Sequence, residues 1–236
     1  MMIPQSTFHL VNDNILKAEV NIHAGNVTLM GVLALPNETD SIVLFVHGSG
    51  SSRHSARNLY VASVLQSMGI GTLLFDLLTA DEELIDNRTA HLRFDIGLLA
   101  ERLIDVTHWV QANPSTSQLK IAYFGASTGA AAALVAAAVL GRQIEAIVSR
   151  GGRPDLAGDA LTEVKSPTLL IVGSFDNAVI ELNQQAFALL HCEKELEIVH
   201  AATHLCEEPG KLEEVAKISA HWFVQKLQKY KLKDSL

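Results

Sequence analysis

The chain has 236 residues, of which 48% are hydrophobic, and its formal net charge is −8 at pH 7. This apolar content excludes an intrinsically disordered chain, because such chains have too few hydrophobic residues to build a core. The negative charge, with no basic block dominating any segment, argues against a protein that binds nucleic acid.

Cysteine usage and the longest apolar run indicate where the protein works. The two cysteines, Cys192 and Cys206, are too few for a disulfide scaffold, so we expect free thiols in a reducing compartment. The first residues lack a charged segment followed by an apolar one, and the apolar run near residues 130–140 is too short to span a bilayer. The sequence therefore predicts a cytoplasmic protein with no membrane partner.

The first part of the chain predicts antiparallel strands. Residues 8–35 contain two or three short strands, with a hairpin turn at Ala24-Gly25-Asn26. Alternating hydrophobic residues in 27–35 indicate that one face of this strand is buried. After a turn at 36–40, the continuous apolar run 42–46 is typical of a strand that is covered on both faces.

Predicted strands and helices alternate in the rest of the chain. Further strands are predicted at 72–75, 119–124, 146–149, 168–172 and 196–199. Helices are predicted at 58–68, 93–112, 130–140, 180–190 and from 209 to about 229, with a short helix after 155. The acidic segment 79–87 is predicted to be a loop.

This alternation favours a parallel sheet with right-handed crossovers. We therefore predict an α/β fold with a mostly parallel, doubly wound sheet and antiparallel N-terminal strands. No repeat, low-complexity tract or linker divides the sequence, so residues 1–236 are predicted to form a single domain. The segment 149–166 is too short for a large lid, which predicts an open active site.

The pentapeptide Gly125-Ala126-Ser127-Thr128-Gly129 lies between a predicted strand and a predicted helix. A G-x-S-x-G sequence in this setting is typical of a nucleophile elbow, a sharp turn that projects the serine hydroxyl from the end of the sheet. The two glycines let strand and helix approach closely, and the helix N-terminus favours a negative charge that develops beside the serine. The alternative is a glycine-rich connection whose serine caps the helix.

Residues capable of acid–base chemistry gather at the carboxyl ends of the predicted strands, where ligands of doubly wound sheets bind. Ser127, Asp176 and His204 each follow a predicted strand, in the chain order of one class of catalytic triad. A serine hydroxyl is a poor nucleophile until a base takes its proton, and the base needs an acid that fixes its tautomer. We therefore predict Ser127 as the nucleophile, His204 as the base and Asp176 as the residue that orients His204.

Two of these assignments have rivals. His200 is the rival of His204 as the base, but it is predicted at the end of a strand and so reaches the serine poorly. The alternative interpretation of His204 is an ordinary histidine on a surface loop. Asp176 also suits a tight turn. Its rivals are Asp155, which also follows the strand after the elbow, and Asp76, which precedes the serine.

A loop after the first buried strand predicts the second half of an oxyanion hole. In the sequence His47-Gly48-Ser49-Gly50, the backbone N–H of Ser49 joins that of Thr128 in binding the carbonyl oxygen as it gains charge. We expect the His47 side chain to bond to loop backbone and to transfer no proton.

Five stretches of the chain together resemble the α/β-hydrolases, and more narrowly the dienelactone hydrolase-related family. They are HGSGSSRHSARN at 47–58, FDLLT at 75–79, FGASTGAAA at 124–132, SRGGRPDLA at 149–157 and ATHLCEEPG at 202–210. The resemblance implies a triad of Ser127, Asp176 and His204 that acts on esters or lactones through an acyl-enzyme. The name-giving members of the family hold a cysteine where this elbow holds Ser127.

Arg53, Arg57, Arg150 and Arg153 lie on or near loops that border the predicted site. The guanidinium fork suits a carboxylate or a phosphate, which makes Arg53 and Arg150 candidates for substrate binding. The alternative, which we favour, pairs these arginines with the acidic run 81–83 and with Asp86.

Two other functions compete with hydrolysis. A nucleotide-binding module would explain Gly48-Ser49-Gly50, which begins like a dinucleotide-binding fingerprint, but Arg53 stands in place of the third glycine. A non-catalytic hydrolase fold used as a receptor is the second alternative. We predict a serine hydrolase of carboxylic esters, thioesters or lactones that takes a small-molecule substrate and needs neither cofactor nor metal. Whether it forms a homo-oligomer stays open.

Overall fold

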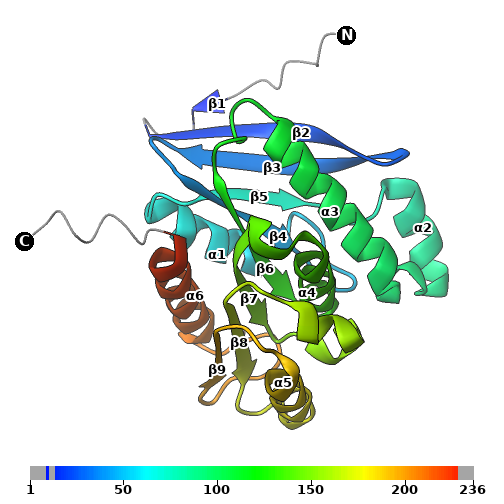
Figure 1. Cartoon of the computed structure of the whole chain (residues 1–236), viewed down its shortest axis with the longest axis vertical. Helices are drawn as coiled ribbons and strands as arrows, with labels where there is room; N and C mark the ends of the chain where they lie inside the picture. Colours follow the sequence, from blue (N-terminus) through cyan, green and yellow to red (C-terminus); the bar gives the residue numbers. More distant parts are fainter. Residues whose placement is uncertain (1–8, 11–13, 228–236) are drawn as a thin grey trace, which may run out of the picture.

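A computed structural model describes residues 9–10 and 14–227. Its described part contains a nine-stranded sheet in the order β1-β2-β3-β5-β4-β6-β7-β8-β9 (Figure 1). The strands are β1 (His9–Leu10), β2 (Ile15–Ala24), β3 (Val27–Pro36), β4 (Ser41–Val46), β5 (Gly71–Phe75), β6 (Lys120–Ala126), β7 (Ile144–Arg150), β8 (Thr168–Gly173) and β9 (Lys194–Val199). The α-helices are α1 (Ala56–Ser67), α2 (Ala80–Thr89), α3 (Ile96–Ala112), α4 (Thr128–Leu140), α5 (Asn177–Leu189) and α6 (Lys211–Leu227).

The sheet is antiparallel at its N-terminal end and parallel elsewhere. β1, β2, β3 and β5 pair with one another antiparallel, and every pair from β5 through β4 and β6 to β9 is parallel. This confirms the predicted α/β-hydrolase fold. The hairpin is longer than predicted, because β2 and β3 pair without a break from Ile15 opposite Pro36 to Ala24 opposite Val27. Phe8, where the first strand was predicted to begin, lies outside the described residues.

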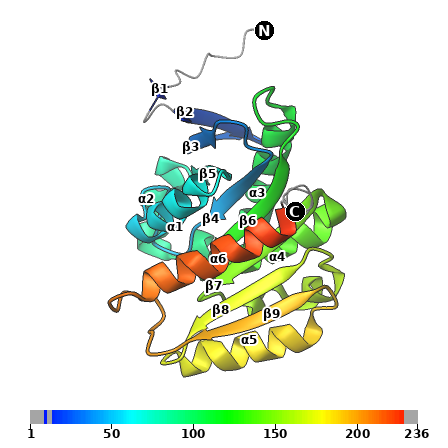
Figure 2. The same ribbon diagram turned by 90° about the vertical axis from the view of Figure 1, so that its left-hand side faces the viewer.

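Helices cover both faces of the sheet. α1 and α6 lie on one face, in front of the strands in Figure 2, while α3, α4 and α5 lie on the other. Every residue of β4, β5 and β8 is buried, as expected for strands between two helical layers. In α4 four consecutive alanines at 130–133 are completely buried, and their small side chains let the helix pack close to the sheet. That close approach positions the start of α4 at the candidate site.

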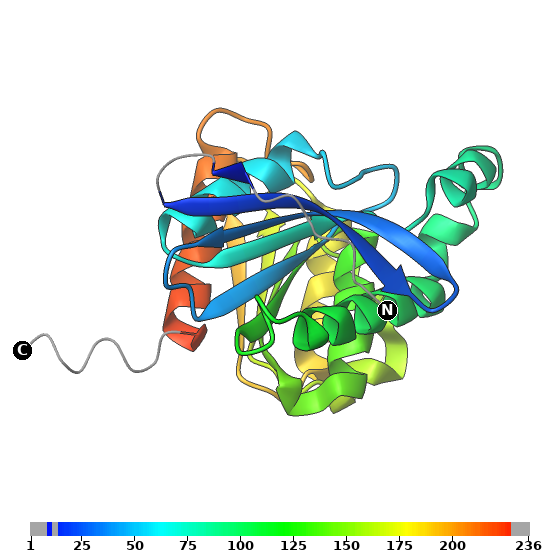
Figure 3. The same ribbon diagram turned by 90° about the horizontal axis from the view of Figure 1, so that it is seen from above.

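One predicted loop is a helix. The acidic segment 79–87 forms α2, which Figure 3 shows at the edge of the molecule. A capping box starts it: Thr79 Oγ1 accepts from Glu82 N–H, and the Glu82 carboxylate accepts from Thr79 N–H. Leu84 and Ile85 are 63% and 52% exposed, so α2 lacks the buried apolar stripe by which a helix is usually predicted.

The other helix limits differ by a few residues. A 3₁₀ turn at Leu92–Phe94 precedes α3, which begins at Ile96 because the Asp95 side chain caps it by accepting from Leu98 N–H (3.0 Å). The short helix after 155 is a 3₁₀ segment, Pro154–Glu163, and no large lid follows β7. The predicted end of the last helix, near residue 229, lies outside the described residues. In the described part, no helix is long and apolar enough to cross a membrane.

Candidate active site

The predicted elbow has a strained backbone. β6 ends at Ala126 and α4 begins at Thr128, so Ser127 alone makes the turn. Its φ of 50° and ψ of −123° fall in a region that residues with side chains rarely adopt. Ser127 N–H donates to the Arg150 carbonyl (3.3 Å), and Arg153 N–H donates to the Ser127 carbonyl (3.1 Å). The serine side chain makes no capping bond to α4, which argues against a merely structural cap.

Two glycines make this turn possible. A Cβ added at Gly125 would lie 2.5 Å from Ala130 Cα, and one added at Gly129 would lie 2.2 Å from the Val46 carbonyl oxygen. Non-bonded carbon atoms prefer a separation of about 3.5–4.0 Å. The strand and helix therefore meet at a distance that only glycine allows, in agreement with the sequence pattern.

We predict that Gly129→Ala destabilises the fold by about 2–3 kcal/mol or more, because the new methyl group overlaps two backbone carbonyl oxygens that cannot move independently of β4. Urea denaturation followed by circular dichroism measures this. The matched control is Gly97→Ala at an exposed position in the first turn of α3, where the added Cβ makes only an ordinary contact at 3.4 Å. That control should be neutral or stabilising, and equal losses in the two variants would contradict the packing argument.

Asp176 and His204 are joined by a short hydrogen bond. His204 Nδ1 lies 2.6 Å from Asp176 Oδ2. Asp176 is the N-cap residue of α5, but its side chain makes no capping bond and is directed to the histidine instead. A carboxylate at Nδ1 favours the tautomer that leaves Nε2 free to act as a base. The Asp176 side chain is 16% exposed and that of His204 37% exposed, so the ring is the more accessible partner.

The two rival aspartates have other partners. Asp155 accepts two hydrogen bonds of 2.8 Å from the Arg153 guanidinium. Asp76 accepts from the Arg53 backbone N–H (2.7 Å) and also pairs with its guanidinium. Of the three candidates, Asp176 is the one that the structure joins to His204.

Ser127 and His204 flank the same short segment at the end of β7. A Cβ added at Gly151 would lie 3.4 Å from the ring atoms Nδ1 and Cε1 of His204. Gly151 follows Arg150, whose carbonyl accepts from Ser127 N–H. The bond from Ser127 Oγ to His204 Nε2 is not formed in the described chain, and such catalytic bonds often tighten only with substrate. The rival His200 is exposed just beyond β9.

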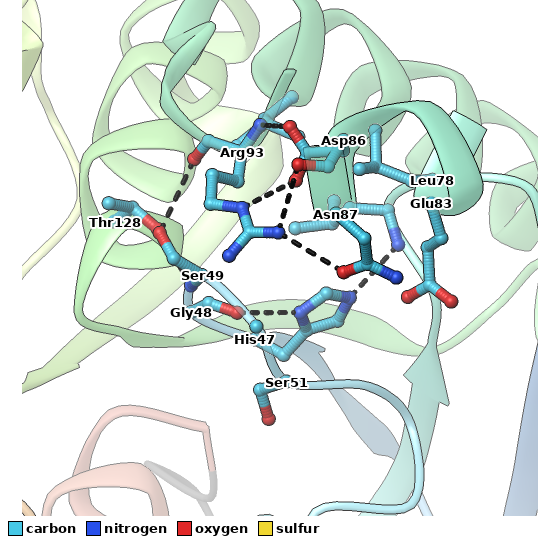
Figure 4. A pocket seen from close by; sticks show the side chains of 13 residues that line it. His47, Gly48, Ser49, Ser51, Leu78, Glu83, Asp86, Asn87, Arg93 and Thr128 are labelled. Carbon is cyan, nitrogen blue, oxygen red and sulfur yellow. Dashed lines mark hydrogen bonds and ion pairs between the residues drawn. The ribbon is translucent and has the colours of Figure 1, made fainter. Parts of the chain in front are cut away.

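Ser49 and Thr128, the predicted oxyanion residues, are in contact (Figure 4). Ser49 N–H donates to Thr128 Oγ1 (3.1 Å), and the two hydroxyl oxygens lie 2.9 Å apart. A Cβ added at Gly48 would lie 2.8 Å from Ser127 Cβ, so this loop packs directly against the serine. The structure brings the predicted donors to the elbow, but Ser49 N–H has a side-chain acceptor that a substrate oxygen would have to replace.

The His47 ring joins two loops, as the sequence analysis expects. Its Nε2 accepts from Leu77 N–H (3.1 Å), which leaves the proton on Nδ1 to be donated to the Gly48 carbonyl (3.0 Å). Burial lowers the pKa of His47, although its bond to Gly48 and the charges of Asp76 and Glu83 act in the opposite direction. The ring is therefore neutral and joins the loop that begins at Gly48 to the one that begins at Leu77.

The predicted pairing of the four arginines with the acidic run 81–83 and with Asp86 is wrong. The observed pairs are Arg53 with Asp76, Arg57 with Glu207 and Arg153 with Asp155. The acidic segment pairs with two other arginines instead. Glu82 pairs with Arg102 of α3, and Asp86 pairs with Arg93. The helical form of α2 directs these two carboxylates toward α3 and the 3₁₀ turn before it, away from the loops that carry the four arginines.

Arg150 differs from the other three. The residue is 5% exposed, and its side chain makes neither an ion pair nor a hydrogen bond within the described chain. Burial is the main reason that the pKa of Arg150 falls below its usual range, to about 10; Cys206 and Glu207 act in the opposite direction, and the charge of Arg57 acts in the same direction. The guanidinium nevertheless keeps its positive charge at neutral pH.

A groove of about 480 Å³ lies between the loop 49–57 and α2, and Ser49, which contacts Thr128, is among the residues that line it. α2 contributes Glu83 and Asn87, which the sequence analysis placed in a loop. Arg93 holds this wall in position, because its guanidinium bonds to Asp86 and Asn87 and its carbonyl accepts from Ser49 Oγ (3.5 Å, Figure 4). The T-x-x-E capping box at 79–82 is the sequence signal that predicts this helical wall.

We compared the chain with protein families and with solved structures. No family model matches the chain. A dienelactone hydrolase from Anabaena variabilis ATCC 29413, solved by crystallography, has 56% sequence identity and a TM-score of 0.89, with 91% of this chain and 99% of that chain covered. Est1E from Butyrivibrio proteoclasticus, at 16% identity and a TM-score of 0.74 over 89% of this chain and 99% of its own, shares the fold.

Two curated relatives carry a different name. Both are from Mycobacterium tuberculosis, strains CDC 1551 / Oshkosh and H37Rv, and both are named "Putative phosphoribosyl transferase". Each is 56% identical over 209 residues, which cover 89% of this chain but 46% of the relative. The chain thus spans about half the length of these relatives. By its identity to the Anabaena protein over nearly the whole of both chains, the chain belongs to the dienelactone hydrolase family of the α/β-hydrolases.

Proposed function

We propose that the chain is a serine hydrolase that cleaves a carboxylic ester, thioester or lactone through an acyl-enzyme. The observation that carries this proposal is the 2.6 Å bond between Asp176 and His204, formed beside a serine in a strained strand-to-helix turn. A cap, a turn or a surface histidine requires none of these features. Membership in the dienelactone hydrolase family supports the same reaction class.

The proposed first half-reaction makes the acyl-enzyme. Ser127 Oγ attacks the carbonyl carbon while its proton passes to His204 Nε2, and the Asp176 carboxylate stabilises the imidazolium that results. The carbonyl oxygen, now negative, accepts from the backbone N–H groups of Ser49 and Thr128. As a charged acceptor it binds Ser49 N–H more strongly than the neutral Thr128 hydroxyl does. Each such donor contributes about 3 kcal/mol to transition-state stabilisation.

The second half-reaction releases the acid. The first tetrahedral intermediate collapses, the bond to the leaving oxygen or sulfur breaks, and His204 returns the proton to that atom. Water then gives a proton to His204 and attacks the acyl carbonyl, and the second collapse restores Ser127 Oγ–H. The residues of this chain complete the cycle without a cofactor.

The experiment is turnover of p-nitrophenyl esters from acetate to decanoate by the purified chain, with and without one equivalent of an organophosphonate. We expect turnover that stops when one equivalent has reacted, because the phosphonate captures the activated serine. The acyl length that is hydrolysed fastest then indicates the length of the pocket that binds the acyl chain.

The second candidate is a non-catalytic receptor built on the same fold. Binding of the esters without turnover, together with no reaction with the phosphonate, would replace the hydrolase proposal by this one. The phosphoribosyl transferase name of the mycobacterial relatives belongs to proteins about twice as long, and we propose hydrolysis for the part that this chain matches.

A further inference from the structure

Two adjacent glycines separate the residues that hold Ser127 in its strained turn. Ser127 N–H donates to the Arg150 carbonyl, and the Ser127 carbonyl accepts from Arg153 N–H, so these two residues hold both of its peptide groups. Gly151 and Gly152 lie between them, and glycine is the most permissive residue in backbone conformation. The geometry of the turn therefore depends on what fixes the two glycines.

Gly151 also borders the histidine of the candidate triad. A Cβ added at Gly151 would lie 3.0 Å from the His204 carbonyl oxygen and 3.4 Å from two atoms of its ring. The N–H of Gly151 donates to the Ile171 carbonyl (2.8 Å), which fastens this glycine to β8. A shift of the two glycines would therefore disturb the supports of the serine and of the histidine together.

Asn183 of α5 fastens the second glycine. Its Nδ2 donates to the Gly152 carbonyl (3.0 Å) and to the Val179 carbonyl one turn earlier in the helix (2.8 Å), and the residue is completely buried. Both partners are carbonyl oxygens, so only the NH₂ group of the amide can face them, which fixes the orientation of the amide. Asp176 is the N-cap residue of the same helix. α5 thus connects the triad aspartate with the segment that holds the serine.

The amide of Asn183 is costly as a core residue. Its Oδ1 is enclosed and has no hydrogen-bond partner within the described chain. A buried acceptor without a donor lowers stability, and features that break a local rule in this way are expected at functional sites. A leucine would fill a similar space without a polar atom. Packing alone therefore does not explain an asparagine at this position.

We propose that Asn183 is a positioning residue for the candidate triad, an inference that rests on the proposed hydrolase function. By holding the Gly152 carbonyl, Asn183 keeps Arg153 N–H in place. That N–H holds the Ser127 carbonyl, and with it the direction of the serine hydroxyl. Asn183 touches no reacting atom and acts through the backbone. Its effect on the rate can still be large, because a misplacement of about 1 Å can slow a reaction by about 100-fold.

The test is Asn183→Leu, which removes the donor and keeps a similar volume. Per folded molecule, the rate of acyl-enzyme formation from a p-nitrophenyl ester and the rate of fluorophosphonate labelling should fall together by about 10- to 100-fold. The ester concentration that half-saturates acylation should stay near the wild-type value, because a completely buried side chain does not touch the substrate. The urea midpoint should also stay near that value, since one unsatisfied acceptor, Oδ1, is exchanged for another, the Gly152 carbonyl.

Two further variants separate the hydrogen bond from packing. Asn183→Ser keeps a bond to Val179, because a serine hydroxyl in a helix donates to the carbonyl one turn back, but its side chain is too short to reach Gly152. Its acylation rate per folded molecule should fall as in Asn183→Leu, even if the leucine variant folds poorly. Ser149→Ala is the matched control and should leave the acylation rate unchanged. Ser149 Oγ also packs against Gly152, where an added Cβ would overlap it, but this buried oxygen has no hydrogen-bond partner within the described chain.

Failure of this role and failure of the hydrolase function give different results. Wild-type acylation rates per folded molecule in both Asn183 variants would overturn the positioning role alone, and a lower urea midpoint with those rates would assign Asn183 a purely structural role. An equal loss of rate in Ser149→Ala and Asn183→Leu would mean that packing at Gly152 controls the rate, which also overturns the proposal. Absence of both turnover and labelling in the wild type contradicts the proposed function itself.

Discussion

Replacing Ser127 by alanine should lower kcat for p-nitrophenyl ester hydrolysis by about 10⁴- to 10⁶-fold, because the acyl-enzyme can no longer form. A small residual rate over water should remain, since the proposed oxyanion donors and the binding groove are still present. Stopped-flow kinetics with the ester that the wild type prefers measures the loss. Retention of more than about a tenth of the wild-type rate would mean that another group supplies the nucleophile.

The variant Ser127→Gly is the matched control for folding. Glycine adopts a backbone φ of 50° and ψ of −123° more readily than a residue with a side chain, so relief of this strain should stabilise the fold by about 1 kcal/mol or more. We therefore expect a protein that is as inactive as Ser127→Ala but has a higher urea midpoint. A loss of activity with this gain in stability separates chemistry from misfolding.

Changing Asp176 to asparagine should lower kcat by about 10⁴-fold with little change in structure. The carboxylate accepts a hydrogen bond of 2.6 Å from His204 Nδ1–H, and this bond fixes the tautomer that has a free Nε2. An amide at this position can donate to Nδ1, and the ring then carries its proton on Nε2, the nitrogen that we propose accepts the proton of Ser127. Steady-state kinetics gives the rate, and circular dichroism shows whether the fold is kept.

The rival aspartates provide the controls for this prediction. Asp155→Asn and Asp76→Asn alter pairs with Arg153 and Arg53, and neither carboxylate bonds to His204 in the structure. Both variants should therefore keep kcat close to the wild-type value. A loss in Asp155→Asn as large as that in Asp176→Asn would reassign the third member of the triad.

The elbow could be predicted from sequence because its determinants are local. Gly125 and Gly129 have to be glycine for reasons of distance within one strand–turn–helix unit, and the apolar runs on either side identify that unit. The positions of Ser127, Asp176 and His204 at the same edge of the sheet could be predicted for a related reason. Each follows a strand of the parallel part of the sheet, which gathers the carboxyl ends of its strands at one edge.

The partners of the arginines could not be predicted in this way. Which carboxylate meets Arg53 or Arg57 depends on where distant segments pack, and Glu207 is 150 positions from Arg57. α2 escaped prediction because its apolar residues Leu84 and Ile85 are exposed, so that no buried stripe marks the helix. The organisation of residues 1–236 as a single domain stays a prediction.

The measurement that tests the central claim most directly is the site of the covalent intermediate. The purified chain is treated with a fluorophosphonate, digested, and the labelled peptide is sequenced by mass spectrometry. The account predicts one label per chain, on Ser127, and no label on Ser127→Ala. A label on Cys192, Cys206 or Ser49 in place of Ser127 would contradict the assignment of the elbow serine as the nucleophile.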